Sequence, residues 1–245
     1  MRMDEWWLMW NYGINKRAEA LVFNKRAVAL VCAVVSVAAL AWGQADTSRM
    51  AITLERKEGK VWKAVDPALI LASGDVIRFR FKPSFDGYLY VTDYGTSGKY
   101  NLLFPRAETG QKNLVESGKE YLIPATEAFF RVSGPAGYES VYWLVSPVAL
   151  GNNPDFTPAH PSDYKPPVLM PRCDGVVLQA RGLCLDPQAG PHAVDDTEPV
   201  PEDLAKARSV ASRELTIIQD HNQSVLSSAG AATAPLLYCF RIAHK

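Results

Sequence analysis

Histidine is the residue type in this chain best suited to acid–base catalysis or metal binding at neutral pH. The four histidines are His160, His192, His221 and His244. Three of them lie in proline-rich or polar stretches and the fourth is next to the C-terminus, and such positions are usually solvated. The sequence also has no G-x-S-x-G elbow, H-E-x-x-H pair, Walker loop or G-x-G-x-x-G fingerprint. We therefore predict no catalytic residue and no cofactor.

Two acidic segments have some features of cation sites. Residues 93–98 place Asp, Ser and Gly at offsets typical of a calcium loop. This segment lacks the second carboxylate and the bidentate Glu of such a loop, so a hairpin turn explains it better. A second acidic set is better explained as a solvated loop; it comprises Asp195, Asp196, Glu198, Glu202 and Asp203. We therefore predict no metal site.

Tyrosines at alternate positions form the candidate binding surface. Tyr88, Tyr90 and Tyr94 share one face of a predicted strand, with Tyr142 or Tyr100 as a cross-strand partner. If exposed, this stripe is a platform for a sugar, a peptide or a partner protein, because tyrosine combines apolar area with a hydroxyl. The alternative, which we favour because tyrosine is often partly buried, is that residues 147–171 or a helix at 202–212 cover this face.

The cysteines predict one disulfide. Cys173 and Cys184 are 11 positions apart and bracket a short insert with Asp174-Gly175 and Arg181-Gly182 near its ends. Glycines allow the sharp turns that bring two Cα atoms to disulfide distance. Cys239 lies in an apolar stretch, so we expect a buried thiol there. Zinc is excluded because there is no C-x-x-C pair.

The N-terminal region predicts export. Residues 27–42 are sixteen uncharged positions after Lys25 and Arg26, and Gly43-Gln44-Ala45 ends the run with small residues. This pattern is typical of a secretory signal cleaved after Ala45, which indicates a periplasmic or secreted protein. An uncleaved anchor through residues 27–42 is the alternative, although the run is short for a bilayer, which needs about 20 residues. Residues 1–24 are an unusually long leader, which suggests a true start near Val22.

Charge and composition narrow the class of partner. The chain has 26 basic and 26 acidic side chains, which argues against a nucleic-acid protein held by bulk charge. Apolar residues make up 48%, an ordinary value for a globular protein.

Alternation of period two predicts strands from residue 51 to residue 146. In residues 76–82, Ile77, Phe79 and Phe81 share one face and basic residues share the other. About eight short strands separated by turns, without crossover helices, indicate an antiparallel β-sandwich, immunoglobulin-like in architecture. Residues 138–146 are apolar on both faces, which is typical of a central strand. We expect Phe79 and Trp143 in the core.

The chain changes character after Ser146. Seven prolines between residues 147 and 171 indicate an extended connection. The cysteine-bracketed hairpin follows, then a mobile loop at 186–203, one short helix, and strands near 213–218 and 236–243 that complete the sandwich. The predicted organisation is a leader with signal at 1–45, a sandwich core at 46–147, and a C-terminal part at 148–245.

Three stretches carry a resemblance to a known family: residues 74–105, 118–124 and 134–147. They contain a G-D-x-φ-R-F strand, the pair DGYLYV and LLFP, a strand ending in I-P, and a G-P-x-G-x-E strand ending in S-P. Over residues 74–147 the chain resembles the bacterial domain of unknown function 4384. The resemblance implies an exported bacterial β-domain, sometimes attached to peptidase or kinase modules, without catalytic residues or cofactor of its own. The cysteine-bracketed extension departs from this pattern, and this chain has no such attached module.

These observations favour an exported, non-enzymatic interaction module. Its expected partner is an envelope protein, a peptide or a glycan, without nucleic acid, and with membrane contact only through an uncleaved N-terminal segment. The alternative is a small extracytoplasmic hydrolase with a site assembled from loops.

Overall fold

A computed structural model of the chain describes most of residues 47–245, and none of residues 1–46. The described residues are 47–96, 98, 100–150, 170–173, 184–194, 200, 202–211, 215–220, 222–229 and 233–245. The elements are β1 (Thr47–Glu58), β2 (Val61–Ala64), β3 (Val76–Pro83), β4 (Gly87–Tyr94), β5 (Tyr100–Phe104), β6 (Leu114–Val115), β7 (Tyr121–Ile123), β8 (Phe130–Arg131), β9 (Gly137–Ser146), β10 (Gly190–His192), α3 (Glu202–Val210), β11 (Leu215–Asp220), β12 (Gln223–Ala229) and β13 (Leu236–His244).

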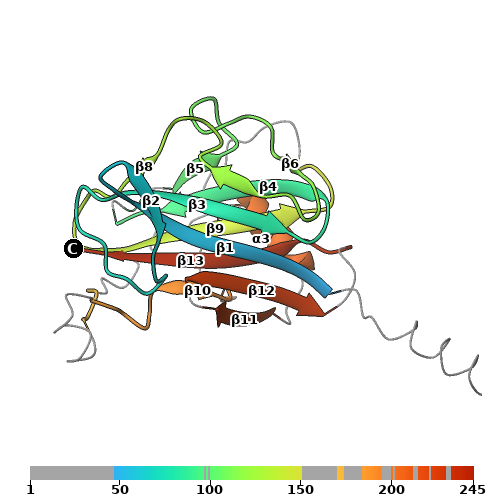
Figure 1. Cartoon of the computed structure of the whole chain (residues 1–245). Helices are drawn as coiled ribbons and strands as arrows, with labels where there is room; N and C mark the ends of the chain where they lie inside the picture. The colour runs from blue at the N-terminus through green and yellow to red at the C-terminus, as the bar shows by residue number, and fades with distance from the viewer. Residues whose placement is uncertain are drawn as a thin grey trace, which may run out of the picture. The chain divides into compact units, whose positions relative to one another are not determined.

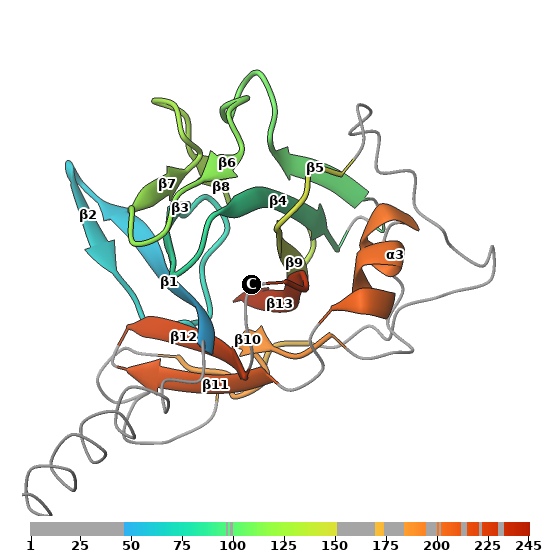
Figure 2. The same ribbon diagram turned by 90° about the vertical axis from the view of Figure 1, so that its right-hand side faces the viewer.

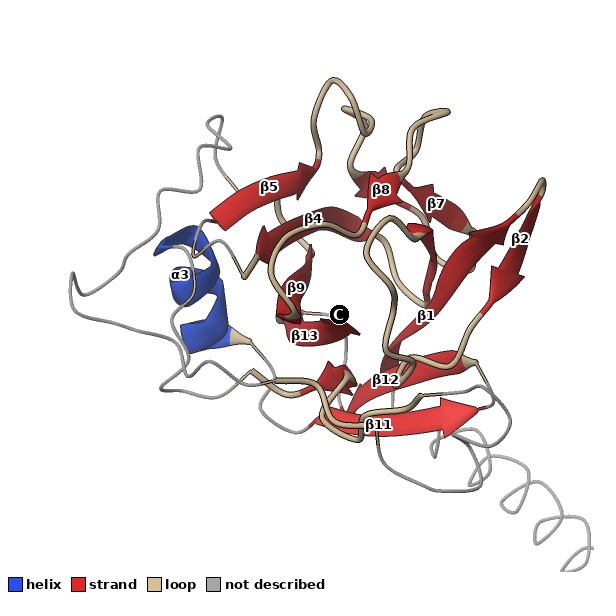
Figure 3. Ribbon diagram, turned by 90° about the vertical axis from the view of Figure 1, so that its left-hand side faces the viewer, coloured by secondary structure: helices blue, strands red, loops and turns tan. Residues whose placement is uncertain are grey.

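The strands form two antiparallel sheets packed face to face (Figure 1). The first sheet has the order β11-β12-β1-β3-β7, with β2 paired to β1 and β8 paired to β3. The second has the order β10-β13-β9-β4-β5, with β6 paired to β4. The predicted antiparallel β-sandwich is therefore confirmed. Within the described part of the chain α3 is the one α-helix, and no helix is long and apolar enough to cross a membrane (Figure 3).

The main core lies between the sheets and follows from strand alternation. On β3, Ile77, Phe79 and Phe81 point inward, as the sequence predicts, while the arginines between them point outward. Phe79 meets Trp143 of β9 edge to face at 5.1 Å between ring centroids, and it meets Phe240 of β13 at 5.5 Å. Both Phe79 and Trp143 are buried, which confirms them as core residues.

A second apolar cluster lies on the outer face of the second sheet. Leu204 and Ala207 of α3 pack there against residues of β4, β9 and β13, and α3 stands outside that sheet in Figure 2. Because β9 lies between β13 and β4 and is covered on both faces, it is the central strand that its sequence predicts.

The C-terminal part completes both sheets, as expected. β12 pairs with β1 over seven positions, and β13 pairs with β9 over nine. The sequence does not predict β12, because QSVLSSA is mostly small and polar and has a weak strand signal. Its Ser224, Leu226 and Ser228 are nevertheless the buried positions of the alternation.

The expectation of a mobile loop at 186–203 is wrong for its first part. Residues 190–192 form β10 on the edge of β13. Asp186 is buried and accepts hydrogen bonds from the Tyr138 hydroxyl and from the backbone N–H groups of Arg172 and Gln188. Proline and acidic composition suggested mobility, but one buried carboxylate with three donors anchors this segment to the sandwich.

The predicted Cys173–Cys184 disulfide is present, with a Cα–Cα distance of 4.9 Å. Backbone hydrogen bonds tie its second half to the sandwich, since Ile70 donates to the carbonyl of Cys184. Cys239 is a buried thiol outside any disulfide, as expected. The insert between the two bonded cysteines lies outside the described residues.

Candidate inter-sheet pocket

A pocket of about 320 Å³ opens between the two sheets, near the end of β4. Its walls are apolar and come from both sheets. The apolar wall residues are Ile77, Phe79, Leu103, Phe130, Val132, Val141 and Ile242. One side is polar and is formed by Asp93, Thr96, Asn101 and Glu139. The combination of apolar walls with a few convergent polar groups is typical of small-ligand sites.

Strand alternation explains why polar residues meet here. On β4 the inward positions are Leu89 and Val91, and the next one is Asp93. On β9 the position two before the inward Val141 is Glu139, and on β13 the position two after the inward Ile242 is His244. The pairing register joins Asp93 to Val141 and Ile242 to Glu139. Glu139 is therefore the diagonal neighbour of both Asp93 and His244 on the inner face.

Glu139 is held in place by a turn and by a histidine. The Thr96 amide donates to Oε1 of Glu139 at 3.3 Å, and the Thr96 hydroxyl donates to the same oxygen at 3.1 Å. Nε2 of His244 is 3.0 Å from that oxygen. Gly95 permits this approach of the turn, because a side chain at this position would collide with Glu139. One oxygen of Glu139 is thus saturated with partners.

His244 is fully buried, so the expectation of a solvated histidine near the C-terminus is wrong. The segment after β2, at residues 71–73, forms backbone hydrogen bonds with the end of β13. Leu71 donates to the carbonyl of Ala243, Lys245 donates to that of Leu71, and Ser73 donates to that of Lys245. Proximity to the C-terminus suggested exposure, but these backbone bonds keep the strand intact to its last residues.

His244 contacts Glu139 but is not itself among the residues that line the pocket, and neither is His192. His192, on the edge strand β10, is partly buried, and its Nε2 lies 3.2 Å from the guanidinium of Arg241. His160 and His221 lie outside the described residues.

Asp93 carries the strongest electrostatic anomaly of the pocket. Burial raises the pKa of its carboxyl to about 8, the negative charge of Glu139 adds to this rise, and a hydrogen bond with Asn101 opposes it. Although Asp93 as a whole is partly exposed, its Oδ1 atom is buried and has no hydrogen-bond partner among the described groups. A buried polar atom without a partner is costly, so a donor that reached this carboxyl group would relieve that cost.

The Asp93–Glu139 pair was missed because its members are 46 residues apart. In the sequence, the segment 93–98 resembles a calcium loop without its second carboxylate, which is why a hairpin turn explains it better. A turn is indeed present, since Gly98 donates to the carbonyl of Gly95. The second carboxylate comes from β9 across the sheet. No set of three or more His, Cys, Asp or Glu residues arranged for a metal ion occurs in the described part of the chain.

The tyrosine stripe is not an open platform. Tyr90 is only 5% exposed and packs in the cluster under α3. Its hydroxyl accepts a hydrogen bond of 2.9 Å from the amide of Leu150. Tyr88 and Tyr94 are partly buried against the same cluster, and Tyr94 stacks on Tyr100 at 4.5 Å between centroids, one of the two expected cross-strand pairs. Of the two alternatives, the covered face that we favoured is the one found, because α3 packs over the centre of the stripe.

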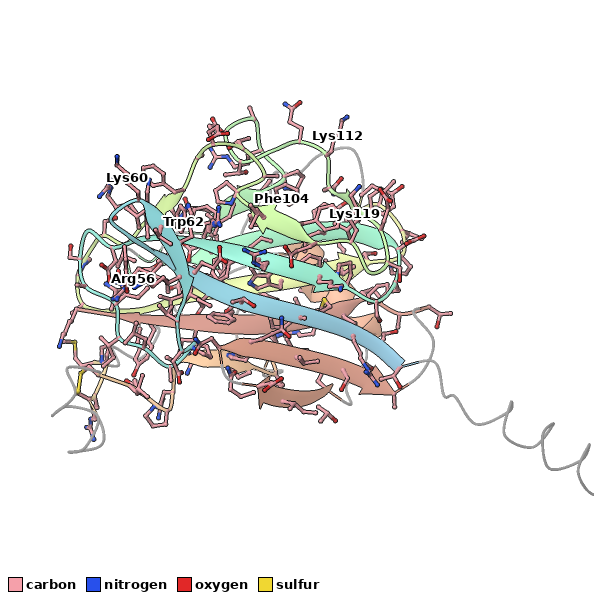
Figure 4. The ribbon with its side chains drawn as sticks, in the orientation of Figure 1. Arg56, Lys60, Trp62, Phe104, Lys112 and Lys119 are labelled. Carbon is pink, nitrogen blue, oxygen red and sulfur yellow. A yellow bond between two sulfur atoms is a disulfide. The ribbon has the colours of Figure 1, made fainter. Side chains whose placement is uncertain are left out.

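The β1–β2 hairpin gathers basic and aromatic side chains, including Arg56, Lys60 and Trp62 (Figure 4). The Arg78 guanidinium lies over the Trp62 ring at 4.3 Å, and the Lys57 ammonium lies over the same ring at 5.7 Å. These cations are engaged with groups of the protein itself.

The structure does not describe the acidic set for which a solvated loop was predicted. Asp195, Asp196 and Glu198, together with the side chains of Glu202 and Asp203, lie outside the described residues.

The comparisons with known proteins bear on one segment of the chain. Searches of the curated proteins and of the solved structures found no match. A family model matches residues 70–149, which include β3 to β9 and the pocket residues Asp93 and Glu139. The resemblance expected over residues 74–147 is confirmed. Residues 70–149 match the model of a family described as a domain of unknown function (DUF4384).

Proposed function

We propose that this protein is an exported bacterial binding module, without enzymatic activity, whose ligand enters the inter-sheet pocket. The observation that supports this most is that Asp93, a residue lining a pocket of about 320 Å³, has a buried Oδ1 atom without a hydrogen-bond partner among the described groups. The groups around it are placed by strands of two packed sheets, so the pocket is held in shape before a ligand arrives. Such preorganisation favours binding, because little ordering remains to be done.

The expected compartment is the periplasm or the exterior of the cell. The basic flank, apolar run and small-residue exit of residues 25–45 support export. The Cys173–Cys184 disulfide supports an oxidising compartment, since such bonds rarely persist in the cytosol. The partner classes are those expected from the sequence, namely an envelope protein, a peptide or a glycan.

Two measurements on protein recovered from cells test export. N-terminal sequencing of the mature product is expected to begin at Asp46, and peptide mapping without reductant is expected to recover Cys173 linked to Cys184. A product that stays in the membrane and retains residues 27–42 would replace export by anchoring. Recovery of both cysteines as thiols would argue against an oxidising compartment.

A small hydrolase is the second candidate, and the Asp93–Glu139 pair is the observation that favours it. In general, two neighbouring carboxyl groups with different pKa values can serve as the acid and the base of a hydrolase. Binding is preferred because Oε1 of Glu139 already contacts two donors of Thr96 and the ring of His244, which leaves it poorly placed to move protons. Turnover of ester or glycoside substrates that disappears in Asp93→Asn would favour the enzyme instead.

Occlusion of the pocket tests binding directly. Ser133 is an exposed residue of the pocket lining, so Ser133→Phe places a ring at the mouth. We expect small polar fragments to shift the amide NMR signals of Thr96 and Gly134 in the mature protein, and Ser133→Phe to abolish these shifts. Ala107→Phe adds the same ring at an exposed position outside the pocket and is the control. Fragment shifts that persist in Ser133→Phe, or none at all in the natural protein, would refute the pocket as binding site.

A further inference from the structure

We propose that the inter-sheet pocket binds an organic cation, an ammonium or guanidinium group on a short apolar chain. The charged group would lie between the carboxylates of Asp93 and Glu139, and the chain would lie along the apolar walls. This inference rests on the proposed binding function and names the chemistry of the ligand. It follows from four features of the pocket.

The first feature is the missing donor. Oδ1 of Asp93 is buried and has no hydrogen-bond partner among the described groups. An ionised carboxylate only accepts hydrogen bonds, so a ligand group that binds the ionised form of Asp93 must donate. An ammonium has three donors, enough to serve both Asp93 and Glu139, which line the same pocket.

The second feature is the sign of the local charge. Asp93 and Glu139 are two acids on one side of an apolar pocket, and Asn101 is neutral. The cationic Arg131 also lines the pocket, but its guanidinium donates to the carbonyl of Gly74 at 3.1 Å and lies over the ring of Phe129. No lysine or arginine in the described part of the chain forms an ion pair with either acid, and His244 is the basic group at Glu139. A ligand cation would neutralise this pair.

The third feature is the size and lining of the space. A volume of about 320 Å³ is at the lower end of small-molecule pockets and is far larger than a bare metal ion needs. Calcium requires six to eight oxygen ligands, whereas the opposite wall of this pocket offers Phe79, Phe130 and aliphatic side chains. Aromatic faces also attract organic cations. The pocket therefore fits a ligand with one charged end and one apolar end.

The fourth feature links binding to protons. The pKa of Asp93 is raised to about 8 by burial and by Glu139, so its carboxyl holds a proton at neutral pH. A cation binds the ionised carboxylate more tightly, and binding must therefore release this proton. As the pH increases toward the pKa of Asp93, the affinity for the cation is expected to rise about tenfold per pH unit. Above this pKa the affinity is expected to stay constant. The groups that face Asp93 and could modify this profile are Glu139, its partner His244 and Asn101.

Isothermal titration calorimetry with matched probes tests the inference on the mature protein. The probes are n-pentylamine, n-pentanol, pentanoate, the tripeptide Gly-Lys-Gly and calcium chloride. We expect the amine to bind, with tighter binding from about pH 6 to about pH 8 and with release of one proton. Pentanol and pentanoate are expected to bind at least about tenfold more weakly. Binding of Gly-Lys-Gly as well as the amine identifies a peptide side chain as a source of the cation, and binding of the amine alone identifies a free amine.

Asp93→Asn is the decisive variant, because it keeps the shape of the side chain and removes its charge. It should weaken amine binding at least about tenfold and flatten the pH profile. Glu127→Gln removes an exposed carboxylate outside the pocket and should change neither. Equal binding of pentanol, tighter binding of calcium than of the amine, or unchanged amine binding by Asp93→Asn would overturn the cation inference. None of these three results would refute the proposed binding function. That function is refuted only if fragment shifts persist in Ser133→Phe or are absent from the natural protein.

Discussion

Among single residues, the carboxyl groups of Glu55 and Asp93 show how nearby charged side chains set the direction of a pKa shift. Glu55 of β1 lies on the outer face of the first sheet, and its side chain is 6% exposed. Arg78 and Arg80 of β3 donate to it at 2.6 Å and 2.8 Å. Burial alone would raise the pKa of Glu55, but these hydrogen bonds outweigh burial and lower it. Asp93 has no such cation, and its pKa rises instead.

Asp93→Asn is expected to stabilise the fold at alkaline pH. Between the unfolded value near 3.8 and the folded value of about 8, the folded state holds a proton that the unfolded state releases, so stability falls as the pH rises through this window. The amide has no such proton, so the advantage of the variant should grow from about pH 5 to about pH 8 and then stay constant. Urea unfolding at a series of pH values measures it. An advantage that is the same at every pH, or that also appears in Glu127→Gln, would show that Asp93 titrates normally.

Glu55→Gln is expected to destabilise the protein by about 1–3 kcal/mol at neutral pH, because two arginines lose their carboxylate. The folded pKa of Glu55 is lowered, so its contribution is present above the unfolded value of about 4.5 and disappears as the pH falls through the folded value. The difference between variant and natural protein should therefore shrink in acid. Glu108→Gln breaks an exposed ion pair with Arg106 and should cost less than about 1 kcal/mol. An equal loss for both variants would contradict this account.

At the scale of elements, α3 is the cover of the second sheet. The helix begins with Glu202 and carries Leu204 and Ala207 on its inner face, where they belong to the same buried cluster as Tyr90 and Leu237. The sequence predicts this inner face, but it does not show which sheet face the helix covers. The helix is short, so packing rather than intrinsic propensity holds it in place.

Leu204→Ala is expected to destabilise the protein by about 2–4 kcal/mol, because Leu204 is fully buried between α3 and the second sheet and its truncation leaves a cavity. The variant should also increase the exposure of Tyr90, which quenching of tyrosine fluorescence would report. Lys206→Ala alters an exposed position on the same helix and serves as the control. A loss below about 1 kcal/mol would show that α3 is docked by other contacts.

At the scale of the whole molecule, strands from both ends of the described chain stabilise the central ones. β1 is paired with β12 and β9 is paired with β13, so both sheets need C-terminal strands. The family match ends at residue 149, which leaves β11, β12 and β13 outside it. We expect the mature protein to unfold as one cooperative unit, because the core between the sheets is shared.

Phe79→Ala is expected to cost about 3–5 kcal/mol, since its ring contacts Trp143 and Phe240 across the sandwich. Far-ultraviolet and near-ultraviolet circular dichroism should lose their signals at the same denaturant concentration. Phe129→Ala removes a ring that is 43% exposed and should cost less than about 1 kcal/mol. Separate transitions for the two signals, or equal losses for the two variants, would contradict a single shared core.

Features that depend on neighbouring residues can be predicted from the sequence. Period-two alternation predicts β3, β4 and β9 and their buried faces, and prolines and glycines mark their ends. The short insert and its glycines were enough to predict the Cys173–Cys184 bond. β12 could not be predicted in this way, because its small polar residues form a strand only when the neighbouring strands β1 and β11 provide hydrogen-bond partners.

The pocket was decided by the tertiary structure alone. Asp93, Glu139 and His244 each look like an ordinary polar residue near the end of a strand, and nothing local distinguishes them. They meet because β4, β9 and β13 are neighbours in one sheet and because the register places the three side chains on its inner face. Strand order depends on contacts between distant segments, whereas alternation depends on adjacent residues. The same reason explains the tyrosines, whose spacing was evident although the helix that covers them comes from a distant part of the chain.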